Sequence, residues 1–145
     1  MSTVESLLNL KRWKEDEAKQ QFAHCLRELA VEEKRLLALE EQYKDVGRKF
    51  ESASNELIEI AEIRRLNRYI EYLLDKIVHQ KNVIVQKELQ VEESRKALQE
   101  ASKEKKTFEK LDEKQKSVLS KEVKRKEQIN IDENAVIRHA RKSKQ

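Results

Sequence analysis

The residues that most often perform chemistry in proteins are few and scattered in this chain. Its three histidines, His24, His79 and His139, lack the HExxH spacing of a zinc enzyme, and a single cysteine, Cys25, leaves no second thiol for a zinc site. One Gly among 145 residues cannot build a glycine-rich phosphate-binding loop. We therefore expect no enzyme, no cofactor and no metal ion.

Adjacent carboxylates and the cysteine have simpler interpretations. Pairs such as Glu32 and Glu33 are expected to be solvated charges on a helix. Cys25 lies on an apolar stripe beside Phe22 and Leu29, where it behaves as a small hydrophobic residue. A lone cysteine also excludes an internal disulfide and is compatible with a reducing cytosol.

The elements that position these residues are predicted to be long helices. The chain has one Gly and no Pro, and 41% of its residues are charged, so it lacks the turn residues of a β-rich or α/β domain. Stepping alternately by four and three residues from Val4 to Phe50 visits 14 positions, of which 11 are apolar. This sustained heptad predicts a helix that buries one seam, and its periodicity argues against disorder.

A polar break separates this helix from a second one. Residues 52–55 (Ser-Ala-Ser-Asn) are small and mostly polar, a composition that favours turns and helix caps. We predict a first helix at about 2–51, a turn at about 52–55 and a second helix at about 56–140. Because Leu57 and Ile60 continue the first heptad frame, a turn nearer residue 62 is the alternative.

The fold class is therefore predicted as all-α, with two long helices in an antiparallel coiled-coil hairpin and one domain over residues 1–145. Apolar residues recur every seven positions from Ile70 to Leu98 in the second helix. If the chain folds back near residue 56, residue n faces residue 112 − n, so Val4 faces Phe108. Residues past about 111 then form a C-terminal overhang with a frayed end.

Basic residues concentrate where this internal pairing should end. Residues 103–126 hold ten Lys and Arg against five Asp and Glu, in a chain whose net charge is +4. Such a stretch attracts nucleic acid, but acidic residues are interleaved and Phe108 is its only aromatic residue for stacking on bases. We expect a protein partner there and no nucleic acid.

Two tyrosines stand out near the start of the second helix. Tyr69 and Tyr72 are three residues apart and straddle Ile70, so both cannot face the seam. Tyr43 lies opposite Tyr69 under the fold-back rule. At least one aromatic ring should be exposed, as in many protein-binding patches.

Four segments, taken in order, resemble the FliJ family of bacterial flagellar type III export. They are Leu7–Lys19, Arg68–Ile77, Glu93–Leu111 and Ile131–Ala135, the last with an Asp-Glu-x-Ala pattern followed by Arg138 and Arg141. The chain departs from the family in its polar turn without Gly and in Gly47, where a bulky residue is common.

The resemblance implies an antiparallel coiled coil similar to the stalk subunit of rotary ATPases, whose joined ends enter the hexameric export ATPase ring. It also implies contacts with the export gate, a membrane protein, and with export chaperones. The chain would then be cytoplasmic and peripherally associated with the inner face of the cell membrane. The expected gate-binding residues are Tyr69, Leu73, Lys76, Gln80, Leu36 and Tyr43. The expected ATPase-ring residues are Lys103, Lys105, Lys106, Lys121, Lys124, Arg125, Asp132 and Glu133.

Two alternatives stay open at this point. The chain could be the corresponding stalk of a virulence type III secretion system, which shares the fold. It could also be a generic scaffold that dimerises as a long parallel coiled coil, with residues 52–55 as a skip in the heptads. The hairpin reading predicts a monomer in isolation. No signal peptide or membrane-spanning run is expected from the sequence.

Overall fold

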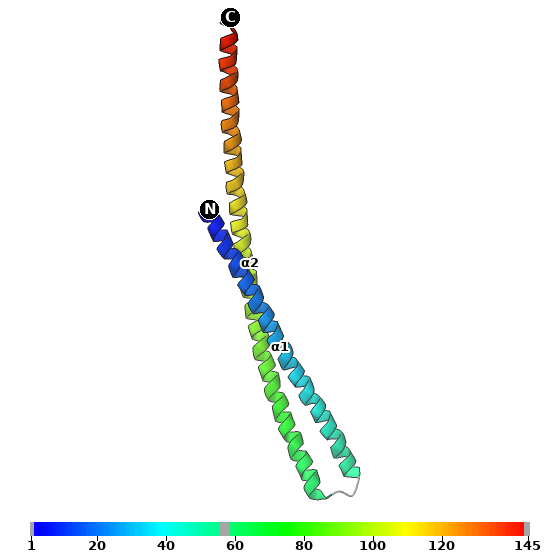
Figure 1. Ribbon diagram of the computed structural model, residues 1–145. Helices are drawn as coiled ribbons and strands as arrows, with labels where there is room; N and C mark the ends of the chain where they lie inside the picture. Colours follow the sequence, from blue (N-terminus) through cyan, green and yellow to red (C-terminus); the bar gives the residue numbers. More distant parts are fainter. Residues whose placement is uncertain (1, 56–58, 144–145) are drawn as a thin grey trace. The chain divides into compact units, whose positions relative to one another are not determined.

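The computed structural model describes residues 2–55 and 59–143, and these residues form two helices (Figure 1). α1 spans Thr3–Asn55 and α2 spans Ile60–Ser143. The helices pack against each other in antiparallel order, α2 is the longer one, and the described residues contain no strand. The predicted all-α hairpin is confirmed.

α1 begins with a side-chain cap. The Ser2 hydroxyl oxygen accepts a hydrogen bond from the Glu5 backbone N–H at 3.1 Å, which satisfies one of the unpaired donors of the first turn. Glu5 and Glu62 place negative charge in the first turns of α1 and α2, and Arg141 and Lys142 place positive charge in the last turn of α2. These charges oppose the helix dipole at each of those ends.

The predicted turn at residues 52–55 is wrong, because α1 continues through them to Asn55. The Ser54 hydroxyl donates to the Phe50 carbonyl at 2.9 Å within the helix, so it does not cap a new one. Ala53 is 4% exposed and continues the apolar frame after Phe50. The alternative turn near residue 62 is also wrong, since α2 begins at Ile60. Leu57 lies outside the described residues.

The residues fall into two compact units, which we name and describe separately. The hairpin unit is Asp16–Glu100, and the terminal unit is Met1–Glu15 with Ala101–Gln145. The single domain expected from the sequence stays a prediction.

The seam of the hairpin unit follows the heptad that the sequence predicts. From Ala18 to Phe50, every frame position except Tyr43 is buried or half-buried. Cys25 is 5% exposed, in agreement with its interpretation as a core residue. On α2, Leu73, Ile77 and Ile84 are the most buried apolar side chains of the seam.

Leu73 provides a direct test of this core. It is 1% exposed, whereas its neighbour Leu74 is 42% exposed. Leu73→Ala should lower the free energy of unfolding by about 2–5 kcal/mol, because it removes buried methyl groups and leaves a cavity. Leu74→Ala should change it by less than about 1 kcal/mol. Urea unfolding followed by circular dichroism measures both, and equal effects of the two substitutions would contradict the described seam.

Candidate protein-binding surfaces

Polar seam positions of the hairpin unit are joined across the helices. The Gln80 amide donates to the Glu32 backbone carbonyl at 2.9 Å and to the Glu32 carboxylate at 2.6 Å. The Lys87 ammonium contacts the Glu28 carboxylate at 2.8 Å. This hydrogen bond lowers the pKa of Glu28 and raises the pKa of Lys87, so each group stays ionised over a wider range of pH.

Two of the expected gate-binding residues are therefore used inside the hairpin. Leu73 is 1% exposed and Gln80 is 8% exposed. Both occupy seam positions of the α2 heptad, which explains why they face α1 rather than solvent. With the hairpin closed, most of each side chain is covered by the packed helices.

The neighbouring aromatic residues are exposed. Tyr69 and Tyr72 are 43% and 54% exposed, and their rings stack with centroids 6.1 Å apart. The Lys76 ammonium lies 5.5 Å from the Tyr72 ring centroid, a cation–π arrangement. We call Tyr69, Tyr72 and Lys76 the aromatic surface. The expectation that at least one tyrosine is exposed is confirmed, and Tyr72, which is not among the expected gate-binding residues, is the more exposed of the two.

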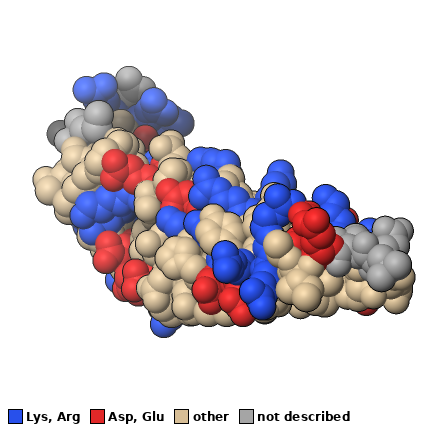
Figure 2. Space-filling view, turned by 90° about the horizontal axis from the view of Figure 1, so that it is seen from below, with Lys and Arg blue, Asp and Glu red and all other residues tan. Residues whose placement is uncertain are grey.

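A shallow hollow beside this surface joins the two helices of the hairpin unit. Its lining includes two of the residues expected to bind the gate, Lys76 and Gln80. It also includes residues outside that expected set: Arg35, Ala38, Leu39, Gln42 and His79. The remaining two expected residues, on α1, are Tyr43, which is 38% exposed, and Leu36, which is half-buried. Figure 2 shows Lys and Arg interleaved with Asp and Glu and with uncharged residues over the face it presents, without one dominant sign.

Ion pairs hold α1 against α2 in the terminal unit. Lys11 contacts Glu104 at 2.9 Å, and Lys105 contacts Glu15 at 3.0 Å. The bond from Lys11 lowers the pKa of Glu104, and the bond to Glu15 raises the pKa of Lys105. Lys105, expected to bind the ATPase ring, is therefore engaged with α1.

Burial along α2 ends at Asp112, which is 8% exposed and pairs with Lys116 at 3.0 Å. Every residue from 113 to 143 is exposed, and we call this part of α2 the overhang. Contact with α1 continues slightly past the predicted residue 111, because the Lys116 ammonium also lies 3.8 Å from the Glu5 carboxylate of α1. The expected ring-binding residues other than Lys105 are all exposed, at Lys103, Lys106, Lys121, Lys124, Arg125, Asp132 and Glu133.

A family model described as the flagellar FliJ protein matches residues 1–144. The chain belongs to the FliJ family. It is thus a type III export stalk protein, and the family is one of stalk proteins rather than enzymes. No curated protein matches the chain. Among solved structures, it is similar to CT670 from Chlamydia trachomatis, described as a YscO homologue, with 18% identity over 99% of this chain and 98% of that one and a TM-score of 0.43.

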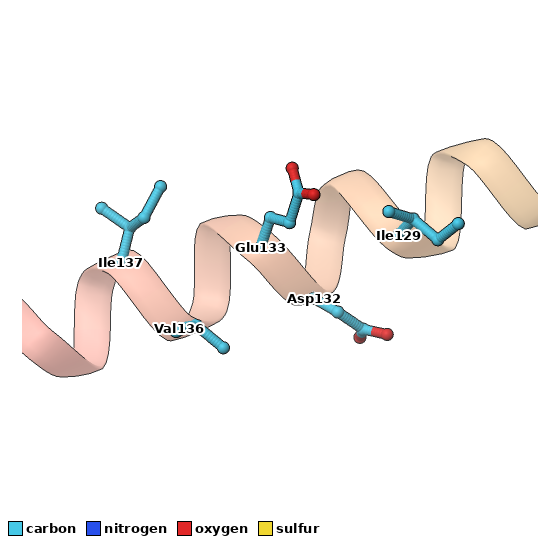
Figure 3. A pocket seen from close by; sticks show the side chains of 5 residues that line it. All are labelled: Ile129, Asp132, Glu133, Val136 and Ile137. Atoms are coloured by element: carbon cyan, nitrogen blue, oxygen red, sulfur yellow. The ribbon is translucent and has the colours of Figure 1, made fainter.

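α2 of this FliJ-family chain carries two hollows, one where the overhang begins and one within it, and neither was expected from the sequence. One is lined by Leu111, Lys114, Gln115, Val118 and Leu119. The other is lined by Ile129, Asp132, Glu133, Val136 and Ile137. Figure 3 shows Glu133 and Ile137 projecting from one side of the helix and Asp132 and Val136 from the other.

Within residues 2–55 and 59–143, no group of His, Cys, Asp and Glu side chains is placed to hold a metal ion. Neither α1 nor α2, as far as described, has a stretch long and apolar enough to cross a membrane.

Proposed function

We propose that this chain is the stalk that enters the hexameric ATPase ring of the flagellar export apparatus with its terminal unit and stimulates the ATPase. The exposed overhang supports this proposal most strongly. A lone helix of such length is marginal in water, because most helical stability in proteins comes from packing against a partner. An overhang exposed along residues 113–143 therefore calls for another protein.

The charges of the overhang favour an electrostatic contribution to ring binding. Lys121, Lys124 and Arg125 lie within five residues and are all exposed. Lys103 and Lys106 add exposed positive charge nearer the ion-paired segment. Long-range attraction of this kind accelerates encounter and weakens as salt rises.

Reversing the three clustered charges tests the ring proposal. The triple variant Lys121→Glu, Lys124→Glu, Arg125→Glu should lose most stimulation of the export ATPase, measured as phosphate release at low and high salt. A matched control reverses three exposed lysines of the hairpin unit, Lys34, Lys49 and Lys81, and should stimulate normally. Equal stimulation by both variants at low salt would rule out ring binding through the basic overhang.

We further propose that the aromatic surface binds the export gate and so holds the stalk at the inner face of the membrane. Two stacked, exposed tyrosines with an adjacent lysine have the composition of an interface anchor. Tyr43 extends the exposed aromatic set from α1. The same stalk would also receive export chaperones.

Tyr69→Ala should weaken binding to the isolated gate domain by about 30-fold, as expected for the loss of an aromatic anchor. Because Tyr69 is 43% exposed, the unfolding midpoint should hardly change. Isothermal titration calorimetry gives the affinity. Trp13→Ala, which removes a 55% exposed aromatic residue from the terminal unit, is the control and should bind the gate normally. A destabilised Tyr69→Ala variant with unchanged affinity would mean that Tyr69 acts in the core.

A further inference from the structure

The overhang region of α2 carries the same apolar pattern twice. Leu111, Val118 and Leu119 line the first hollow, and Ile129, Val136 and Ile137 line the second. Each member of the second triad lies 18 residues after its counterpart in the first. Since 18 residues complete about five helical turns, both triads lie on one face of the helix.

All six side chains are exposed, with values from 42% for Ile129 to 68% for Val136. An apolar face of this kind on an unpaired helix marks an interaction site.

The charged residues between the two triads indicate which kind of helix can pair with this face. Glu122 and Lys126 lie one turn apart on the same face, midway between the two hollows, and both are exposed. Among the described residues, neither of the two makes an ion pair within the chain. A helix that pairs with this face must therefore present apolar residues opposite both triads. Between them it must place a positive charge opposite Glu122 and a negative charge opposite Lys126.

We propose that a second copy of this chain covers this face, with the two overhangs antiparallel and centred near residue 124. In that register, Leu111 faces the partner's Ile137, and Leu119 faces the partner's Ile129. At the centre, Glu122 faces the partner's Lys126, and symmetry repeats the same pair. The interface is self-complementary, as a two-fold dimer requires.

The central charges also select the direction of pairing. A parallel pair in register would bury the same apolar triads, but it would place Lys126 beside the partner's Lys126 and Glu122 beside the partner's Glu122. Like charges at such positions are destabilising, so the antiparallel pair is favoured.

This dimer leaves the hairpin intact and differs from the monomer that the sequence predicts. It does not depend on the proposed ring contact. If the overhang does enter the ATPase ring, one overhang cannot be covered by the ring and by a second copy at once. Self-association would then keep the free stalk away from the ring.

Sedimentation equilibrium of the full-length chain over a concentration series tests the proposal. The unmodified chain should show a reversible monomer–dimer equilibrium. Ile129→Asp should abolish the dimer, because it places a charge in the apolar face. Ile131→Asp is the matched control: Ile131 is 59% exposed but points about 200° away around the helix, so its substitution should leave the equilibrium unchanged.

Charge exchange tests the register. Glu122→Lys should weaken the dimer by roughly tenfold, since it converts both central pairs into repulsive ones. Adding Lys126→Glu should restore the affinity. A chain that stays monomeric at all concentrations would overturn the proposal, as would a dimer equally weakened by Ile131→Asp and Ile129→Asp. A double variant weaker than Glu122→Lys would overturn the antiparallel register.

Discussion

Polar side chains buried at a helix–helix seam must find hydrogen-bond or ion-pair partners, because a buried polar group without one costs about 1–3 kcal/mol. That constraint governs how α1 and α2 meet. In the hairpin unit, Gln80 bonds to Glu32 and Lys87 pairs with Glu28. In the terminal unit, Lys105 pairs with Glu15, which is almost fully buried. Apolar residues alone would tolerate slippage along the seam. A shift by one turn would separate these pairs, so the polar residues fix the register and the apolar residues supply the driving force.

The end of the seam separates two kinds of surface. Up to Asp112, polar residues of α2 such as Gln80, Lys87 and Lys105 are occupied by contacts with α1, and they are poor candidates for binding another protein. Past that residue, every described side chain of α2 is exposed, and the last ion pair to α1 is the one between Lys116 and Glu5. In the hairpin unit, the candidate surface consists of Tyr69 and Tyr72. Both are exposed beside the buried Leu73, so they can contact a partner while Leu73 stays in the seam. In a FliJ-family stalk built in this way, a partner can bind the aromatic surface without covering the overhang, and the reverse also holds.

Much of this arrangement could be predicted from the sequence because coiled-coil heptads report burial directly. The heptad frame from Val4 to Phe50 predicts the seam of α1. The rule that residue n faces residue 112 − n places Gln80 opposite Glu32, as the structure shows. The turn was misplaced because small polar residues also fit inside a helix, where Ser54 bonds back to Phe50. Leu73 and Gln80 were expected at a binding surface although the heptad itself placed them on the seam. The two apolar triads of α2 were not expected because charged residues lie among them, and their common face follows only from their 18-residue offset. The resemblance to the FliJ family rested on the order of four segments, which periodicity alone does not provide, and the family model over residues 1–144 established the family.

The register of the polar seam is tested most directly by carbodiimide coupling of the unmodified chain at low concentration, followed by peptide mass spectrometry. This reagent joins a lysine to a carboxylate that it already contacts, without a spacer. The structure predicts links from Lys87 to Glu28, from Lys11 to Glu104 and from Lys105 to Glu15, all in the species with the mass of one chain. Finding these links only in species of twice that mass, or finding Lys87 coupled to distant carboxylates and not to Glu28, would contradict the antiparallel hairpin and its register.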